Sequence, residues 1–345
     1  MKKNNLFFCF SISLLLLSST LLAQSRDYLN DSSNASLDDI FREADEIQSV
    51  RSLLIQQNGE LIEERYFNGR SPNRAFNIKS ASKSIIGLLV GIAIEEEFIP
   101  SIDEPISTYF PEYFEQNPDP KKENITVRNL LSMQAGLRST SSGNYGAWVL
   151  SKNWVEYALR QDFTSAIGGR MVYSTGTSHL LSVIVSKASG MSTKAFAERY
   201  LFDPMDITVG GWERDPQGYY MGGNNLALKP ADMLKIGQML LDNGMYNDQQ
   251  IITTDWIIDS FKTYTYSNYN PYGYGYQWWN KATSGYTTLF AWGHGGQYIF
   301  MIPELDAVIV MTSSVTAASQ RRTYKRPVFD LLENSIIPFL EERNN

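Results

Sequence analysis

The chain carries the stretch Ser80-Ala81-Ser82-Lys83 immediately before a long apolar run that extends to Ile94. A serine and a lysine three positions apart lie on one face of a helix, one turn from each other. A helix that begins at Ser80 presents free backbone N–H groups and its positive dipole end, which favour a negatively charged oxygen there. The stretch therefore predicts a nucleophilic hydroxyl, a nearby amine to take its proton and the beginning of an oxyanion hole.

The apolar run after Lys83 predicts the centre of the fold. Its apolar positions occupy nearly every side of a helix: Ile85, Ile86, Leu88, Leu89, Val90, Ile92, Ala93 and Ile94. A helix that is apolar nearly all round is buried on all sides. We therefore expect a central helix with Ser80 at its beginning. Ser80 then lies where the first strands meet the helical region, which is a favoured place for a pocket.

Strand signals occur near both ends of the chain. Residues 52–57 and 61–67 flank Asn58-Gly59, which is a strong hairpin turn signal. Later strands are expected over residues 275–280, 287–292, 297–302 and 307–312. An amphipathic helix over residues 329–340 closes the chain. These signals predict an α+β fold: one antiparallel sheet built from both termini and flanked by helices, with a mainly helical region inserted between them.

The sequence also divides into an N-terminal signal, a short lead and one domain. Residues 1–23 resemble an export signal, because Lys2 and Lys3 precede an apolar stretch that ends at a small residue, Ala23. A retained N-terminal anchor is the alternative, which the serines within that stretch disfavour. We expect an exported protein, periplasmic or secreted. The remaining segments are a flexible lead over residues 24–39 and one domain over residues 40–345, with a sheet part at about 40–80 and 255–345 and a helical part at about 81–254.

The composition of the chain excludes several kinds of catalytic site and several classes of partner. The only cysteine among the 345 residues is Cys9, inside the predicted signal, so the mature chain has no disulfide, thiolate nucleophile or cysteine metal site. Two histidines make a catalytic zinc site improbable, and we expect neither a metal nor another cofactor. A net charge of −7 argues against nucleic acid and against an anionic membrane surface as partners.

Two further motifs follow the Ser-x-x-Lys stretch. Tyr173-Ser174-Thr175-Gly176 precedes a predicted helix, and a second motif, His294-Gly295-Gly296, leads into a predicted strand. In this order the three motifs resemble those of the penicillin-recognising serine hydrolases. The similarity is to the branch with class C β-lactamases, D-alanyl-D-alanine carboxypeptidases and related esterases. The run from Tyr274 to Trp279 and the run from Gly293 to Gln297 are most similar to 6-aminohexanoate-dimer hydrolases.

This resemblance, which spans about residue 52 to the C-terminus, implies a β-lactamase/transpeptidase-like fold and a set of catalytic roles. Ser80 would be the nucleophile, Lys83 would take its proton, and Tyr173 would help to pass a proton to the leaving group. The backbone N–H groups of Ser80 and Gln297 would form the oxyanion hole.

The same resemblance implies substrate-binding roles and contains two departures from the pattern. Gly295 and Gly296 would keep the strand free of side chains, so that a substrate backbone can lie along it. Thr175 stands where β-lactamases of this branch carry an asparagine that binds the substrate. His294 stands where they carry a lysine, and a neutral imidazole holds an anion less well. Both departures favour an esterase or amidase over a true β-lactamase.

We therefore expect a serine hydrolase that cleaves a small ester or amide through a Ser80 acyl-enzyme. A D,D-peptidase or β-lactamase that acts on cell-wall peptides or β-lactams is the alternative. A second alternative is a sensor that is acylated without turnover.

Three other features have mainly structural interpretations. His179, on a predicted helix, is expected to be an ordinary helix residue. The tyrosine-dense stretch over residues 264–276 is expected to form a packed, partly exposed loop, with an aromatic wall beside the cleft as the alternative. Trp148 could provide a second wall.

Overall fold

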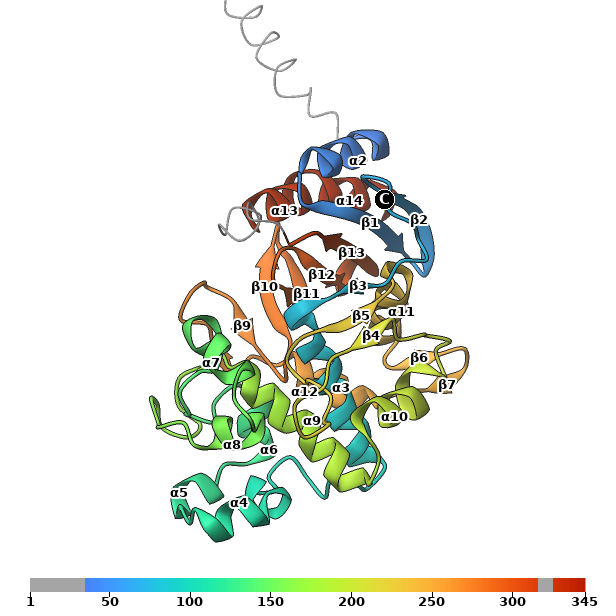
Figure 1. Cartoon of the computed structure of the whole chain (residues 1–345). Helices are drawn as coiled ribbons and strands as arrows, with labels where there is room; N and C mark the ends of the chain where they lie inside the picture. Colours follow the sequence, from blue (N-terminus) through green and yellow to red (C-terminus); the bar gives the residue numbers. More distant parts are fainter. Residues whose placement is uncertain (1–34, 316–324, 345) are drawn as a thin grey trace, which may run out of the picture.

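The computed structural model describes residues 35–315 and 325–344 and has the expected α+β arrangement (Figure 1). The predicted export signal and most of the predicted lead lie outside the described residues. An eight-stranded antiparallel sheet has the order β2-β1-β13-β12-β11-β10-β9-β8. Its strands are β1 (Val50–Gln57), β2 (Glu60–Tyr66), β8 (Thr265–Tyr266), β9 (Gly273–Tyr274), β10 (Trp279–Thr283), β11 (Tyr286–Gly293), β12 (Gln297–Ile302) and β13 (Ala307–Ser313). The prediction that both ends of the chain build one sheet is confirmed.

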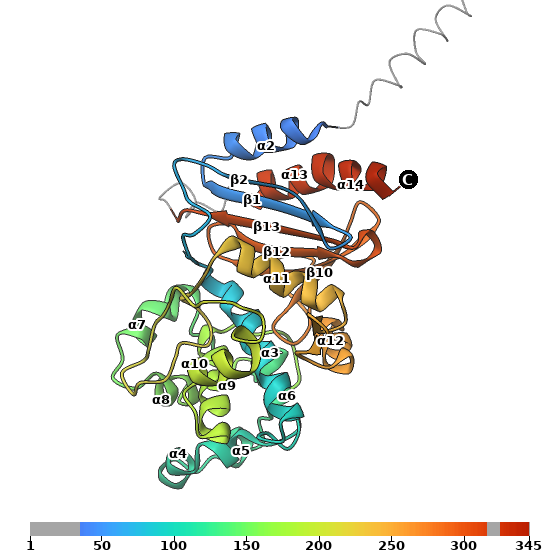
Figure 2. The ribbon, with the colours of Figure 1, turned by 90° about the vertical axis from the view of Figure 1, so that its right-hand side faces the viewer.

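Helices from the two ends of the chain cover one face of this sheet (Figures 1 and 2). They are α2 (Leu37–Glu46), α13 (Lys325–Leu331), the π-helical turn η7 (Leu332–Ile336) and α14 (Ile337–Asn344). Along β1 the side chains alternate, because successive residues of a strand point to opposite faces. Leu53 and Ile55 pack in the core beneath these helices, whereas Leu54 belongs to the core on the other face.

The predicted flexible lead is too long at its C-terminal end. Ser36 accepts a hydrogen bond from the backbone N–H of Asp39, and the Asp39 side chain accepts one from the backbone of Ser36. This reciprocal capping satisfies two backbone donors that a helix start otherwise leaves unpaired. Residues 37–39 therefore belong to α2.

The other face of the sheet meets α11 (Pro230–Leu241) and the helical region (Figure 2). The central helix is α3 (Ser82–Glu95), and its residues from Ser82 to Ala93 are all buried, as predicted. Around it lie η2 (Ile106–Tyr109), α4 (Pro111–Gln116), α5 (Pro120–Glu123), α6 (Val127–Leu131), η3 (Ser142–Asn144), α7 (Tyr145–Val149), α8 (Trp154–Leu159), α9 (Thr175–Ser189), α10 (Thr193–Ala197), η4 (Glu198–Phe202) and α12 (Thr254–Phe261).

Two smaller sheets were not predicted. They are β3-β5-β4, made of β3 (Phe76–Asn77), β5 (Leu226–Leu228) and β4 (Gly211–Trp212), and the pair β6 (Met245–Tyr246) with β7 (Gln249–Gln250). Strands of two or three residues give almost no alternation in the sequence.

The helical region also extends beyond the predicted boundary at residue 254, because α12 continues to Phe261.

The predicted strand over residues 275–280 begins only at Trp279. Gln277 interrupts it with a φ of 67°, a left-handed conformation that a strand residue does not adopt. Its backbone N–H donates to the carbonyl of Leu131 in α6, which draws the chain toward the helical region. A contact between distant segments therefore overrides the local strand signal.

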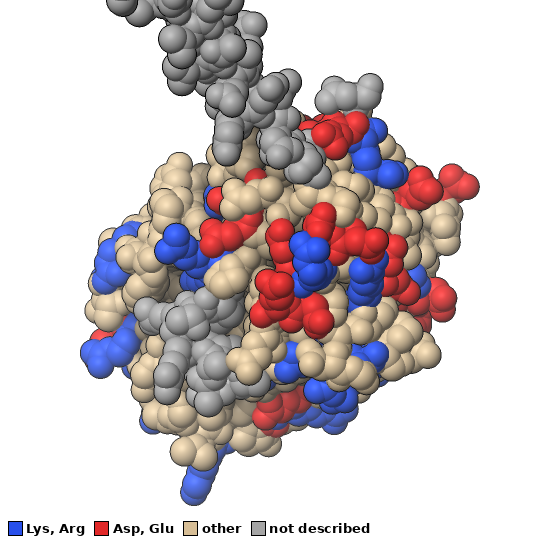
Figure 3. Space-filling model, turned by 90° about the horizontal axis from the view of Figure 1, so that it is seen from above, with Lys and Arg blue, Asp and Glu red and all other residues tan. Residues whose placement is uncertain are grey.

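Charged side chains of both signs lie together on the face above α2 and β2 (Figure 3). Arg42 pairs with Asp39, and Arg65 pairs with Asp38 and Glu63. In the described part of the chain, no helix combines the length and apolarity that crossing a bilayer requires.

Candidate active site

Ser80 lies at the junction between the sheet and the helical region. It occupies the 3₁₀ turn η1 (Lys79–Ala81), and α3 begins two residues later at Ser82 rather than at Ser80 as predicted. The Ser82 hydroxyl donates to the carbonyl of Lys79 at 2.6 Å and accepts from the N–H of Leu226 at 3.2 Å. These contacts fix the turn, in which Ser80 is partly exposed.

The end of β11 lies against this turn. A Cβ on Gly293 would stand 2.0 Å from the carbonyl oxygen of Ile78, so only a glycine allows the backbone before Ser80 to approach so closely. The last pair between β10 and β11 joins Trp279 to Phe290. Residues 291–293 therefore extend past the end of β10, beside the segment that carries Ser80.

Lys83 is buried beneath Ser80, with 1% of its surface exposed. Its Nζ lies 3.3 Å from Ser80 Oγ, 3.4 Å from Thr175 Oγ1 and 2.5 Å from the carbonyl oxygen of Gly223. Burial lowers the pKa of Lys83 to about 7, because the protein interior solvates an ammonium group less well than water does. A large fraction of Lys83 is therefore neutral near pH 7.

The contacts of Lys83 also orient its lone pair. A neutral amine has two N–H groups and one lone pair, and the Gly223 carbonyl can only accept. With the second N–H directed at Thr175, the lone pair faces the Ser80 hydroxyl. This arrangement suits the removal of the proton from Ser80 Oγ.

Tyr173 joins this group from a third part of the chain. Nζ of Lys83 lies 5.0 Å from the centre of the Tyr173 ring. Trp279 and Tyr274 pack against the ring, with centroid distances of 5.6 and 6.1 Å. The structure thus brings together the three side chains that the sequence singled out, and the acid–base role of the phenol stays a prediction.

Thr175 lies beneath the site, not on an open wall. Its side chain is buried, and its hydroxyl is bonded to Ser141 at 2.8 Å as well as facing Lys83. The side chain of Ser174 caps α9, which fixes Thr175 as the first residue of that helix. Thr175 is therefore placed to hold Lys83, whereas the sequence had suggested contact with substrate.

His294, Gly295 and Gly296 form the turn between β11 and β12 and lead into a strand, as predicted. Gly295 and Gly296 have φ values of 88° and 104°, which favour glycine. Partial burial lowers the pKa of His294 below its ordinary value, and the nearby cations Lys79 and Lys325 lower it further. Burial and the two cations therefore both favour the neutral imidazole.

Gln297 lies in β12, between β11 and β13. Its side chain donates to the carbonyl of Ser313 at 2.7 Å and accepts from the N–H of Ser313 at 3.0 Å. The side chain thus fixes the end of β13. The role of its backbone N–H in the oxyanion hole stays a prediction.

Gln277 has a structural role that the sequence did not indicate. It is buried, and its side chain donates to the carbonyl of Leu131 in α6 and accepts from Ser178 in α9. Its own carbonyl accepts from Ser84 in α3. One glutamine therefore joins the three helices that surround the site, and its place within an aromatic run was the only signal.

Two expectations about aromatic residues are now resolved. Trp148 is fully buried and its indole N–H donates to the carbonyl of Trp154, so it does not line a cleft. The tyrosine-dense stretch is packed and partly exposed as expected, with Tyr274 buried and Tyr269 exposed, but it contains the paired strands β8 and β9 and is not only a loop.

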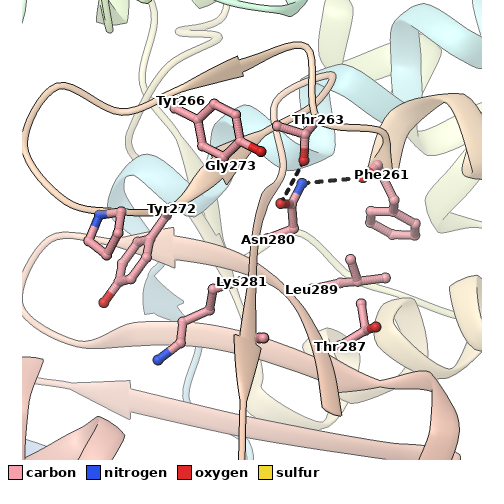
Figure 4. A pocket seen from close by; sticks show the side chains of 11 residues that line it. Phe261, Thr263, Tyr266, Tyr272, Gly273, Asn280, Lys281, Thr287 and Leu289 are labelled. Atoms are coloured by element: carbon pink, nitrogen blue, oxygen red, sulfur yellow. Dashed lines mark hydrogen bonds between the residues drawn. The ribbon is translucent and has the colours of Figure 1, made fainter. Parts of the chain in front are cut away.

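A pocket of about 660 Å³ lies at the β8–β10 edge of the sheet, and Tyr266 and Tyr272 contribute to its lining (Figure 4). Asn280 in the same pocket donates to the carbonyl of Phe261 and accepts from Thr263. The pocket includes none of the predicted site residues.

Within the described residues, no group of three histidine, cysteine, aspartate or glutamate side chains could hold a metal ion.

Comparison with known proteins gives one family match and distant relatives. Residues 37–331 match the family model described as Beta-lactamase. The 6-aminohexanoate-dimer hydrolase of Paenarthrobacter ureafaciens is 24% identical over 302 residues, which span 76% of this chain and 72% of the relative. The teichoic acid D-alanine hydrolase of Staphylococcus aureus is 24% identical over 263 residues, which span 65% of this chain and 61% of that protein.

The fold recurs in solved structures. A candidate 6-aminohexanoate-dimer hydrolase from Bacillus anthracis has a TM-score of 0.70 at 21% identity, over 88% of this chain and 84% of that one. The predicted β-lactamase/transpeptidase-like fold is thereby confirmed.

Proposed function

The chain belongs to the Beta-lactamase family and is a serine hydrolase of that family. We propose that it cleaves a small ester or amide through an acyl-enzyme on Ser80. One observation carries this proposal. The amine of Lys83 is buried 3.3 Å from Ser80 Oγ, and its pKa of about 7 leaves it able to take a proton.

In the first half of the reaction, neutral Lys83 accepts the proton of Ser80 while Oγ attacks the carbonyl carbon of the substrate. The negative charge that forms on the carbonyl oxygen is stabilised by backbone N–H groups near Ser80. The intermediate then collapses, the bond to the leaving group breaks, and the proton passes from Lys83 to that group, with Tyr173 beside the path.

In the second half, a water molecule attacks the acyl-enzyme and gives its proton to Lys83. The ester bond to Ser80 breaks, the acid product leaves, and the proton returns to Ser80 Oγ. Ser80 and Lys83 thus serve both halves, as microscopic reversibility favours.

The histidine at position 294 supports an ester or amide substrate over a β-lactam, because a neutral imidazole holds a carboxylate less well than the lysine that β-lactamases of this branch carry there. Two relatives suggest substrates to test first. One is named for the dimer of 6-aminohexanoate and one for D-alanine on teichoic acid. A D-alanyl ester and a linear ω-amino amide are therefore the leading candidates.

The test is pre-steady-state hydrolysis of p-nitrophenyl acetate. We expect a stoichiometric burst of p-nitrophenol followed by steady turnover, both lost in Ser80→Ala. Turnover at the wild-type rate in Ser80→Ala would refute the proposal, and a single burst without turnover would favour an acylated sensor. Nitrocefin hydrolysis, or release of terminal D-alanine from a stem-peptide mimic, would favour the β-lactamase or D,D-peptidase alternative.

We also propose that the protein is exported, on the strength of its N-terminal sequence pattern. Mass spectrometry of the protein recovered from a periplasmic or culture fraction should find a mature N-terminus near Gln24. An intact N-terminus in the cytoplasmic fraction would contradict this proposal.

A further inference from the structure

We propose that His179 and Asp215 are positioning residues for Lys83, acting through the backbone of Gly222 and Gly223. The inference rests on the proposed function, because it assigns the two residues to the orientation of the proposed base. It changes the interpretation of His179, which the sequence predicted to be an ordinary helix residue.

The pair is enclosed within the helical region. His179 Nε2 lies 3.0 Å from Asp215 Oδ2, and both side chains are 0% exposed. The imidazole lies against the edges of Trp148 and Trp154, with centroid distances of 5.8 and 5.6 Å. The centres of the two indoles are 4.9 Å apart, so both pack on the same side of the imidazole.

The hydrogen bonds of Asp215 determine the tautomer of His179. The other carboxylate oxygen, Oδ1, accepts from the N–H groups of Gln217 and Tyr219 at 2.9 and 2.8 Å. A carboxylate can only accept, so Nε2 of the histidine carries the proton and donates it to Oδ2. Nδ1 is then the acceptor, and it faces the N–H of Gly222 at 3.5 Å.

The segment that receives this contact is pressed against α9. A Cβ on Gly222 would stand 2.2 Å from the carbonyl oxygen of Ser178, and one on Gly223 would stand 2.6 Å from that of Thr175. Close packing against the α9 backbone therefore holds the two glycines, and His179, which also belongs to α9, adds a hydrogen-bond acceptor for the N–H of Gly222.

The next carbonyl in this segment is the one that holds the proposed base. The Gly223 carbonyl accepts from Lys83 Nζ at 2.5 Å, the shortest of the three contacts of that amine. The groups that face Lys83 are Ser80 from η1, Thr175 from α9, this carbonyl and the ring of Tyr173, which is the titratable neighbour. A displacement of the carbonyl would turn the lone pair away from Ser80, and a misplacement of about 1 Å can cost about 100-fold in rate.

Asp215→Asn tests the pair with little change in shape. An amide nitrogen facing Nε2 donates instead of accepting, so the imidazole proton moves to Nδ1 and opposes the N–H of Gly222. We expect kcat for p-nitrophenyl acetate to fall about 10- to 100-fold, as for other residues that orient a reacting group, with little change in KM. We also expect the acidic limb of the pH profile to move to lower pH, because a carbonyl acceptor favours the ammonium form of Lys83.

Two substitutions of His179 separate its contacts. His179→Asn keeps an acceptor near the position of Nδ1, so we expect the acidic limb of the wild type. His179→Gln keeps only the donor toward Asp215, so we expect it to resemble Asp215→Asn. Ser52→Ala is the control for lost stability, since it removes a buried hydrogen bond to Thr312 within the sheet.

The proposal is overturned if folded Asp215→Asn keeps the wild-type kcat and acidic limb, or if Ser52→Ala shifts that limb equally. If Asp215→Asn does not fold, identical pH profiles for the two His179 variants overturn it instead. Wild-type turnover in Ser80→Ala would instead refute the proposed function, so the two failures are distinguishable.

Discussion

Lys83 is the residue in which the chemistry of the site opposes the stability of the fold. Within the described residues, the groups that contact its amine are oxygens of Ser80, Thr175 and Gly223 and the ring of Tyr173. Hydrogen bonds that the ammonium group donates to these oxygens compensate only part of the cost of removing it from water. The same desolvation that lowers the pKa of Lys83 therefore destabilises the folded state at low pH.

Lys83→Met should stabilise the protein, and the gain should depend on pH. The pKa of Lys83 is about 7 when folded and about 10.5 when unfolded, so the unfolded chain binds the extra proton between these values. Wild-type stability consequently rises with pH across that window. Chemical denaturation should show an advantage of a few kcal/mol for Lys83→Met near pH 6 that shrinks toward pH 10. An advantage that is constant with pH would contradict the buried, depressed lysine.

The rate of the wild-type enzyme should follow the same ionisation. If neutral Lys83 is the base, kcat/KM for p-nitrophenyl acetate should rise with pH to a plateau, with a midpoint near the folded-state pKa of about 7. Stopped-flow measurement of the acylation rate across the pH range checks this. A flat acylation profile from about pH 5 to about pH 9 would exclude Lys83 as the base.

Among the elements, η1 and the end of β11 determine where the nucleophile stands. The 3₁₀ turn packs against β11 and β12, and Ile78, directly before the turn, lies against Gly293. On the far side, Gln277 joins α3, α6 and α9 through its hydrogen bonds. The reacting groups are thus held by a strand on one side and three helices on the other.

Gly293→Ala should separate these elements. The new Cβ would stand 2.0 Å from the backbone oxygen of Ile78, so η1 has to move away from β11. We expect a loss of about 100-fold or more in the acylation rate, because Ser80 moves with the turn. Gly211→Ala is the matched control, since a Cβ there would meet open space. Equal acylation rates in the two variants would show that the contact at Gly293 does not position Ser80.

The whole molecule has its sheet between two cores. The core under α2, α13 and α14 includes Phe300 of β12 and Leu332 of η7, while α3, α9 and α11 pack in the core on the other face. Trp279 belongs to the first core, and Tyr173 and Trp292 are partly buried and pack against it. The core under the terminal helices therefore supports the sheet, and the core on the other face surrounds Lys83.

Leu332→Ala should weaken the first core without changing the chemistry. Its side chain is fully buried, so truncation should lower the free energy of unfolding by about 2–5 kcal/mol. The acidic limb of the pH profile should not move, because Leu332 lies on the face of the sheet opposite α3. A shift of that limb would mean that the two cores are coupled more closely than the contacts suggest.

The local patterns determined most of the elements. Asn58-Gly59 between two apolar segments predicted the β1–β2 hairpin, and its two positive φ values match the turn that these residues favour. The all-round apolar run predicted α3 as the buried central helix. Both signals are short-range, since turn residues and periodicity act within a few positions of each other.

Contacts between distant segments decided the rest. The strand expected to begin at residue 275 begins at Trp279 because Gln277 bonds to α6. Thr175 faces Lys83 because the start of α9 lies beside α3. Neither of these contacts has a signal in the sequence next to Gln277 or Thr175.

By itself, the sequence determined the reacting groups, because a hydroxyl and an amine three residues apart are neighbours on any helix. Only the tertiary structure decided the state and direction of the amine. Burial depresses its pKa, and the carbonyl of Gly223, far along the chain, takes one of its N–H groups. Desolvation and hydrogen-bond direction depend on which segments meet in space, and no spacing along the chain encodes that.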